Sequence, residues 1–225
     1  MNVNLNVEAK EQRLDSQTRV MANTGPLLVL LSAPSGGGKT TLRHQLLAAR
    51  PQMASAVTCT TRVPRDGERD GADYYFLDAG SFLKRVQAGN FLEHATVYGN
   101  SYGILKSEVV GKLRQGKDVL LSVDVQGAAT IRERAQEDPE LKRVLVTVFL
   151  SPPSLAILEE RLLRRGTDSA AIIQKRLSVA KQEITQWKHF DYLLVSTSIS
   201  EDLRRMLAII EAEKMRSGRV QTLEL

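Results

Sequence analysis

The sequence contains few of the residues that most often cross-link or bind metal in small proteins. It has one cysteine, Cys59, and three histidines. A single cysteine cannot form a disulfide within the chain, and the histidines are too scattered to build a zinc site with it. These shortages exclude a disulfide framework and fit a reducing compartment.

Long apolar runs are also missing. The uninterrupted apolar stretches have about seven residues or fewer, whereas a membrane-spanning helix needs roughly 20. Residues 1–24 lack the apolar middle of a secretory signal. We therefore expect a cytoplasmic globular protein with no membrane partner.

Size and charge leave several functional classes open. The 225 residues, 42% of them apolar, can bury a core and suit one domain with insertions. A net charge of +5 favours anionic ligands such as nucleotides, phosphates or nucleic acid. A mild excess of lysine and arginine is also typical of an ordinary solvated surface, so the charge alone does not select among these ligands.

Short apolar runs alternate with stretches of helical periodicity. The runs lie at Leu27–Leu31, Val119–Val123, Val144–Leu150 and Tyr192–Val195. Apolar residues three and four apart predict helices at Thr40–Arg50, Ser81–Ala88, Ile104–Gln115, Gln126–Gln136, Pro153–Arg164, Ala170–Lys188 and Ile199–Arg216. This alternation predicts an α/β fold with a central parallel sheet and helices on both faces. Residues 1–24 are polar and aperiodic, and they are predicted to form a flexible leader.

A glycine-rich segment joins the first apolar run to the first predicted helix. Glycines allow successive backbone N–H groups to point inward, so such a loop and the following helix N-terminus can hold phosphate. The strict pattern G-x-x-x-x-G-K-[ST] is broken at its first position by Ala33. The alternative is a plain turn between strand and helix. The predicted donor-phosphate site comprises Ala33, Pro34, Ser35, Gly36, Gly37, Gly38, Lys39, Thr40 and Thr41.

In this reading, two side chains of the loop have separate roles. Lys39 reaches the β- and γ-phosphates as a point charge, and the Thr40 hydroxyl binds Mg²⁺. Mg²⁺ is therefore the expected metal, with Thr40 as its protein ligand.

Four further stretches follow the loop, and in this order the chain resembles guanylate kinase. They are "TCTTRVPRDGERDGADYYF" (Thr58–Phe76), "GNFLEHATVYGNSYG" (Gly89–Gly103), "VDVQG" (Val123–Gly127) and "RLLRRGTDSAAIIQKRL" (Arg161–Leu177). The resemblance covers about Pro26 to Met215. It implies transfer of the γ-phosphoryl group of MgATP to GMP, and to dGMP, by an enzyme of purine nucleotide metabolism.

The resemblance also implies the architecture. The expected fold is a three-layer P-loop kinase fold in a guanylate-kinase-like domain, residues 25–225. Its core would comprise residues 25–57, 107–150 and 177–225, with a GMP-binding insertion at 58–106 and a mobile lid at 151–176. No nucleic-acid partner is implied, and the oligomeric state stays open.

The implied acceptor site separates phosphate from base. Arg62, Arg65, Tyr74 and Tyr102 match the family's phosphate-binding residues, and guanidinium groups suit phosphate geometry. Glu93 matches the carboxylate that accepts from the N1–H and 2-amino groups of guanine, which adenine lacks. Thr58 matches a base-contacting serine. Asp124 matches an aspartate near the 2-amino group and the metal's water network, although it could also simply cap a helix.

The basic segment completes the implied site. Arg161, Arg165 and Arg176 match arginines that close over the ATP phosphates. The alternative is a solvated helix face. Together with Lys39 and Arg62, these three arginines form the predicted catalytic set.

Three departures from the family pattern concern the bases. Ile104 replaces a Ser or Thr that touches guanine, Ser122 replaces an acid, and "VSTSISED" replaces an Asn-containing run near the adenine. We expect weaker GMP affinity from Ile104, and the strictness of the ATP preference stays open.

The resemblance leaves rival functions to compare. They are a P-loop kinase for another phosphorylated acceptor, a non-catalytic guanylate-kinase-like binding module and a GTPase switch. Glu93 argues against the first and the retained lysine loop against the second. The third would need an N-K-x-D element, which the sequence lacks.

Overall fold

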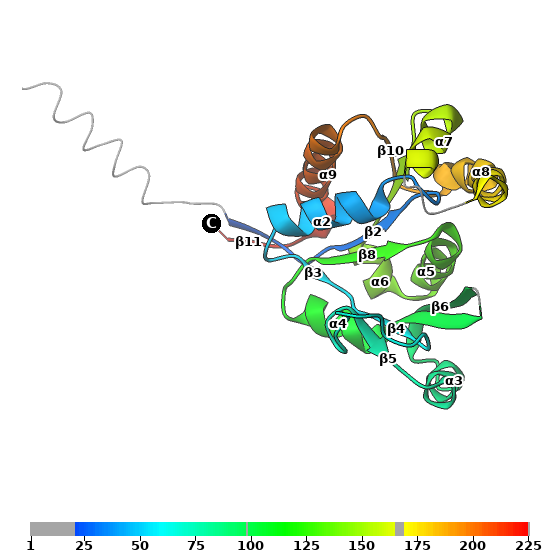
Figure 1. Ribbon diagram of the computed structural model, residues 1–225. Helices are drawn as coiled ribbons and strands as arrows, with labels where there is room; N and C mark the ends of the chain where they lie inside the picture. Colours follow the sequence, from blue (N-terminus) through cyan, green and yellow to red (C-terminus); the bar gives the residue numbers. More distant parts are fainter. Residues whose placement is uncertain (1–20, 98, 165–168, 225) are drawn as a thin grey trace, which may run out of the picture.

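The computed structural model describes residues 21–97, 99–164 and 169–224 (Figure 1). Its centre is a five-stranded parallel sheet with the strand order β10-β9-β2-β8-β3. The strands are β2 (Leu28–Ser32), β3 (Ala54–Ser55), β8 (Val119–Val123), β9 (Leu145–Ser151) and β10 (Tyr192–Val195). The predicted α/β fold is confirmed.

The central strand β2 is buried along its whole length because helices cover both faces of the sheet. Val29 and Leu31 pack with α2 (Lys39–Ala49) and α9 (Ile199–Lys214). Leu28 and Leu30 pack on the other face with α4 (Lys106–Arg114) and α5 (Val125–Glu137). Figure 1 shows α2 and α9 on one side of the sheet and α5 with the short α6 (Pro139–Val144) on the other.

A second, four-stranded sheet has the order β5-β4-β7-β6. It is built from β4 (Thr58–Thr60), β5 (Tyr74–Phe76), β6 (Phe91–Val97) and β7 (Asn100–Leu105), with α3 (Ala79–Gln87) beside it. Cys59, Phe82 and Phe91 form a small core on one face. The Phe82 and Phe91 rings stack with centroids 4.5 Å apart. The opposite face is therefore free to carry polar side chains.

Two helices pack beside the glycine loop. α7 (Leu155–Arg164) and α8 (Ala170–Ile184) share a core that contains Leu158, Leu162, Ile173 and Leu177. A 3₁₀ turn, η1 (Thr185–His189), follows α8. Within the described residues, no helix combines the length and the apolar content needed to cross a membrane.

Several predicted boundaries need correction. The helix predicted from Ile104 begins at Lys106, because Ile104 and Leu105 pair as the end of β7. The helix predicted to reach Lys188 ends at Ile184, and Val144, predicted as strand, ends α6. These are apolar residues at the junction of two elements, where periodicity does not distinguish strand from helix.

The predicted leader also needs correction at its end. Residues Met21–Thr24 form β1, which pairs antiparallel with β11 (Val220–Glu224). The partner strand lies almost 200 residues away, so the local sequence carried no signal for it. Residues 1–20 lie outside the described residues.

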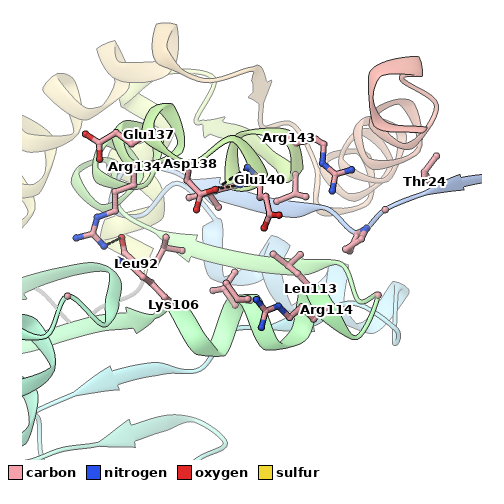
Figure 2. A pocket seen from close by; sticks show the side chains of 18 residues that line it. Thr24, Leu92, Lys106, Leu113, Arg114, Arg134, Glu137, Asp138, Glu140 and Arg143 are labelled. Atoms are coloured by element: carbon pink, nitrogen blue, oxygen red, sulfur yellow. Dashed lines mark hydrogen bonds between the residues drawn. The ribbon is translucent and has the colours of Figure 1, made fainter. Parts of the chain in front are cut away.

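A cavity with a volume of about 760 Å³ opens between α4 and α6 (Figure 2). Three residues of its wall lie just before strands of the sheet: Pro26 before β2, Gly116 before β8 and Val144 before β9. The cavity therefore lies at the amino-terminal edge of the parallel sheet. Ligands of open parallel sheets bind at the opposite, carboxyl-terminal edge, so we place the candidate site there.

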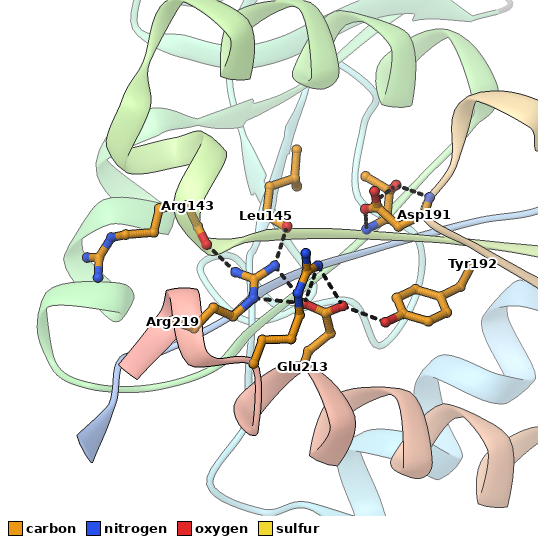
Figure 3. A network of polar contacts seen from close by, with 8 residues as sticks. Arg143, Leu145, Asp191, Tyr192, Glu213 and Arg219 are labelled. Atoms are coloured by element: carbon orange, nitrogen blue, oxygen red, sulfur yellow. Dashed lines mark hydrogen bonds and ion pairs between the residues drawn. The ribbon is translucent and has the colours of Figure 1, made fainter. Parts of the chain in front are cut away.

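A buried carboxylate ties the end of the chain to the central sheet (Figure 3). The Glu213 side chain is 1% exposed and accepts from Tyr192 Oη, Arg216 and Arg219. Arg219, in η2 (Ser217–Arg219), also donates to the carbonyl oxygens of Arg143 and Leu145. Burial alone would raise the pKa of Glu213, but Tyr192 and the arginines outweigh it and lower the pKa.

Replacing Glu213 with alanine is expected to lower the free energy of unfolding by about 3 kcal/mol, because Arg219 would lose its buried counter-charge. Glu211→Ala is the matched control on the same helix. Glu211 is 60% exposed and pairs with Arg50, so its loss should cost less than about 1 kcal/mol. Urea unfolding at pH 7 compares the two. Equal midpoints would show that the network adds no stability.

Candidate active site

The glycine loop connects the buried β2 to α2 at the carboxyl edge of the sheet. Gly36 and Gly38 have φ values of 86° and 100°, which side chains rarely adopt. Gly38 is the N-cap of α2, and no side chain caps the helix there. The first turn of α2 therefore presents free N–H groups, which is the arrangement that binds anions.

Packing against α7 holds this loop in place. A Cβ built on Gly36 would lie 2.9 Å from the side chains of both Leu158 and Leu162. Gly36 is thus required for close contact as well as for its backbone angle. Through this contact, α7 packs directly against the loop.

Lys39 lies near two carboxylates, those of Asp124 and Glu183. Its Nζ donates to the Val123 carbonyl oxygen at 2.9 Å, at the end of β8. Burial lowers the pKa of Lys39, while the nearby charges of Asp124 and Glu183 act in the opposite direction and favour the ammonium. The lysine is therefore a preorganised cation between the loop and β8.

Glu183 is a site residue that the sequence did not reveal. Its Oε2 accepts from the Ser35 backbone N–H at 3.2 Å, although it lies near the end of α8. Burial raises its pKa, and the neighbouring Asp124 charge adds to this. Its position in an amphipathic helix gave no signal, because the contact joins residues 148 positions apart.

The remaining loop residues differ in exposure. Ala33, Pro34 and Gly37 are buried, and the Gly37 N–H donates to the Pro34 carbonyl oxygen at 2.9 Å. Thr40 and Thr41 are exposed at the start of α2. The Thr40 hydroxyl is therefore accessible to a ligand. No group of three metal-binding side chains occurs in the described residues.

The register of the second sheet aligns the predicted acceptor residues. Thr58 lies opposite Tyr74 on one side and Ile104 on the other, and Glu93 lies opposite Ile104. Residues directly opposite one another share a face of a sheet. Tyr102, two positions before Ile104, lies on the same face, and its ring centroid is 6.4 Å from that of Tyr74.

Glu93 is buried beneath the start of α5. It is 7% exposed, and no hydrogen bond engages its carboxylate within the described residues. Burial, reinforced by the Asp124 charge, raises the pKa of Glu93 to about 7, and Arg134 opposes the shift. A buried carboxylate without hydrogen-bond donors is prepared to accept them from a ligand.

Two neighbours of Glu93 were missed from the sequence. A Cβ built on Gly127 would lie 3.1 Å from Glu93 Oε2, so the glycine leaves room for the carboxylate. Arg134 donates to the carbonyl oxygens of Phe91 and Leu92, which holds its charge near Glu93. The sequence motif "VDVQG" contains Gly127 and so pointed to it, whereas no sequence feature pointed to Arg134.

Asp124 caps α5, as its alternative interpretation proposed. Its Oδ1 accepts from the Gly127 N–H at 2.8 Å. Its charge also acts on Lys39, Glu93 and Glu183. The cap and a role in the site are compatible, because the carboxyl end of β8 places Asp124 between the loop and Glu93.

Arg62 is held in a defined orientation. Its Nη2 donates to both oxygens of Glu68, at 2.8 and 2.9 Å, and its Nη1 donates to the Val63 carbonyl oxygen. The guanidinium lies 5.4 Å from the centroid of the Tyr74 ring. Tyr102 also hydrogen-bonds this guanidinium, and because a guanidinium has five N–H donors, these contacts do not use all of them.

Arg65 is positioned only through its backbone. Its N–H donates to Glu68 Oε2 at 2.8 Å, and its side chain is exposed. Glu68, which the sequence did not single out, therefore organises the loop that carries both arginines.

The structure describes two of the three arginines of the basic segment, Arg161 and Arg176. Arg161 Nη2 donates to Ser196 Oγ at 3.3 Å, and Nη1 would lie 4.0 Å from a Cβ on Gly38. This side chain therefore reaches the glycine loop. Arg176 is half-buried on α8. Arg165 lies outside the described residues.

A cavity of about 470 Å³ extends from the loop along α7. Gly36, Gly38 and Thr41 line one end, Arg161 and Arg164 line its side, and residues 196–199 line the other end. It is smaller than the cavity of Figure 2, but it contains the anion-binding loop. The chemistry of its lining makes it the candidate nucleotide site.

Comparison with known proteins agrees with this arrangement. The guanylate kinase family model matches residues 26–213. The chain is 40% identical to guanylate kinase of Maricaulis maris over 198 residues, which is 88% of each chain. It is 41% identical to that of Coxiella burnetii over 188 residues, covering 84% of this chain and 88% of the relative.

A solved structure gives the same result. The crystal structure of guanylate kinase from Anaplasma phagocytophilum superimposes with a TM-score of 0.69 at 32% identity. The match covers 89% of this chain and 92% of that one. The sequence match across nearly the whole chain, the shared fold and the glycine loop at the carboxyl edge of the sheet all agree, and this protein belongs to the guanylate kinase family.

Proposed function

We propose that this protein transfers the γ-phosphoryl group of MgATP to GMP, and to dGMP, giving ADP and GDP. One observation carries the proposal. Lys39 and Glu93 flank the same carboxyl end of β8, the lysine bonded to Val123 and the carboxylate packed beside Gly127. A donor held by the loop and an acceptor read by Glu93 would therefore meet at that strand end.

Glu93 would read the base of the acceptor. An ionised carboxylate has two oxygens, which can accept from the N1–H and the 2-amino group of guanine. With adenine, the buried charge would stay without donors, at a cost of roughly 1 to 3 kcal/mol or more. Thr58 and Asp124 would add contacts to the same base. Ile104 is 2% exposed and packs in the core, so we expect it to donate no hydrogen bond there.

The acceptor phosphate needs cations rather than a catalytic base. The second pKa of a phosphate monoester is near 6, so the attacking oxygen is already ionised at neutral pH. Arg62, Arg65, Tyr74 and Tyr102 would hold it. Arg161, with Arg165 and Arg176, would neutralise the charge that moves between the nucleotides.

Mg²⁺ fits the donor set of the loop. Thr40 offers an exposed hydroxyl oxygen, and Mg²⁺ typically takes one or two protein ligands together with nucleotide phosphates and water. Thr40 would therefore hold the ion with the donor's phosphates. When bound, the ion would neutralise negative charge on the β- and γ-phosphates.

The proposed parts of the domain follow from this assignment. Residues 58–106 would be the GMP-binding insertion and residues 151–176 the lid, with the core formed by residues 25–57, 107–150 and 177–225. Closure of the lid would exclude water, which otherwise competes with GMP for the phosphoryl group. We also propose a cytoplasmic location and, as partners, the small-molecule substrates, with no nucleic acid and no membrane. Whether the protein is a monomer or a homo-oligomer stays open.

A coupled assay tests the acceptor. Production of ADP from ATP and Mg²⁺ is measured with GMP, dGMP, AMP, CMP and UMP at equal concentrations. GMP and dGMP are expected to exceed AMP in kcat/KM by a factor of about 10² or more, since AMP leaves Glu93 unpaired. Equal rates with GMP and AMP would contradict the acceptor assignment. Absence of turnover with every acceptor would favour a binding module.

Replacing Glu68 with glutamine is expected to raise the KM for GMP about tenfold, because a charge-assisted pair that orients Arg62 is lost. The KM for ATP should change little. Asp66→Asn is the control, since Asp66 is exposed on the same loop. Steady-state kinetics with each substrate varied separates the effects. A parallel rise in both KM values would indicate general loss of structure instead.

A further inference from the structure

The wall of the 470 Å³ cavity that faces away from the loop would receive the base of the phosphoryl donor. Its phosphate end is set by Gly36, Gly38 and the start of α2. Arg161 lies between the loop and residues 196–199, because its guanidinium is close to Gly38 and donates to Ser196 Oγ. A nucleotide with its phosphates at the loop would therefore extend its base past Arg161 toward residues 196–199. This placement rests on the function proposed above.

The fixed polar groups of this wall already bond one another. Asp202 is 6% exposed, and its carboxylate accepts from Ser196 Oγ at 2.7 Å and from the Thr197 N–H at 3.0 Å. Ser198 Oγ accepts from the Glu201 N–H at the start of α9. The buried carboxylate is therefore paired within the protein and does not need a donor from a base.

Thr197, in this wall, has a hydroxyl that is available to a ligand. The Thr197 side chain is exposed, and its hydroxyl makes no hydrogen bond within the described residues. A hydroxyl rotates, and it can serve as donor or as acceptor. It can therefore meet the 6-amino group of adenine or the 6-oxo group of hypoxanthine and guanine equally well.

Strong discrimination between bases needs a buried polar group that the wrong base leaves unpaired. Among the described residues, the wall has no such side chain while Ser196 satisfies Asp202. We infer that this protein does not select its donor at position 6 of the purine, and that its donor site binds 6-amino and 6-oxo purine nucleoside triphosphates alike. Thr197 supplies the adaptable contact.

The test compares ATP with ITP, which differ only at position 6 and the adjoining N1. With GMP saturating, GDP formation is quantified by chromatography, and kcat/KM is obtained for each donor. The ratio of ATP to ITP is expected to lie within about tenfold. A larger preference for ATP overturns the inference.

Two variants sharpen the test. Ser196→Ala removes the donor to Asp202 Oδ2 and exposes a fixed acceptor, so the ATP-to-ITP ratio should change by about tenfold or more, in favour of the base whose N–H reaches the carboxylate. Thr197→Val keeps the shape but loses the hydroxyl, so kcat/KM should fall about threefold to tenfold with both donors alike. A change in the ratio with Thr197→Val, or none with Ser196→Ala, counts against the inference.

Binding separates this inference from the proposed function. Displacement of a fluorescent ATP analogue gives the affinities for ATP and ITP without turnover. Equal affinities with no GDP from either donor would support the inference and contradict the phosphotransferase proposal. Unequal affinities with normal GDP formation from ATP would do the reverse.

Discussion

Replacing Lys39 with alanine is expected to lower kcat by a factor of about 10³ or more, because a positioned cation at a transferring phosphoryl group has an effect of this size. GMP affinity should change by less than about twofold. Lys39 lies at the start of α2 and bonds Val123, whereas Glu93, the proposed reader of the acceptor base, packs beside Gly127. Stopped-time assays give kcat, and calorimetric titration gives the GMP dissociation constant.

The surroundings of Lys39 explain why its loss should not be rescued by a neighbouring cation. Its ammonium is buried beside Asp124 and Glu183, which oppose the lowering of its pKa by burial. Without it, two carboxylates would face the incoming triphosphate. Lys39→Arg keeps the charge but changes its geometry, so it should retain more activity than alanine. An alanine variant with more than about a tenth of native kcat would contradict the role of Lys39.

Replacing Glu93 with glutamine should lower kcat/KM for GMP by a factor of about 10² to 10³, because two charge-assisted hydrogen bonds are weakened. The preference for GMP over AMP should fall with it. His94→Gln is the control, since the ring of His94 lies against Phe82 and Phe91 on the other face of the sheet. Unchanged selectivity in Glu93→Gln would mean that another group reads the base.

The pH dependence gives the same variant a second readout. The pKa of Glu93 is raised to about 7, chiefly by burial, and the ionised form is the one that accepts from guanine. GMP affinity of the native protein should therefore increase as the pH rises through about 7. The GMP phosphate also titrates near pH 6, but it does so equally for both proteins. The increase in GMP affinity near pH 7 should be absent in Glu93→Gln.

Stability should show the opposite trend with pH. A carboxyl whose pKa is higher in the folded state contributes stability below its unfolded value, and this contribution is lost as the pH rises through the folded value. For Glu93 the window runs from 4.5 to about 7. Without ligand, Glu93→Gln should gain stability relative to native at pH 8.5, on the order of 1 to 3 kcal/mol. Thermal melts at pH 5.5 and 8.5 measure the change.

The glycine loop could be predicted because its signal is local. The buried strand, the glycines and the start of α2 are contiguous, and backbone amide geometry makes such a seam an anion site. The insertion was harder to predict. Its strands are short and polar, and their pairing brings together residues 58, 74, 93 and 104, which no periodicity relates.

What the sequence by itself determined was the alternation of strands and helices, the glycine loop and the family motifs, because these depend on neighbours along the chain. The tertiary structure alone decided that Glu183 bonds the loop, that Gly127 and Arg134 surround Glu93, and that Glu68 orients Arg62. Burial and charge proximity arise only when distant segments pack together. They are also what shifts a carboxyl pKa from 4.5 to about 7.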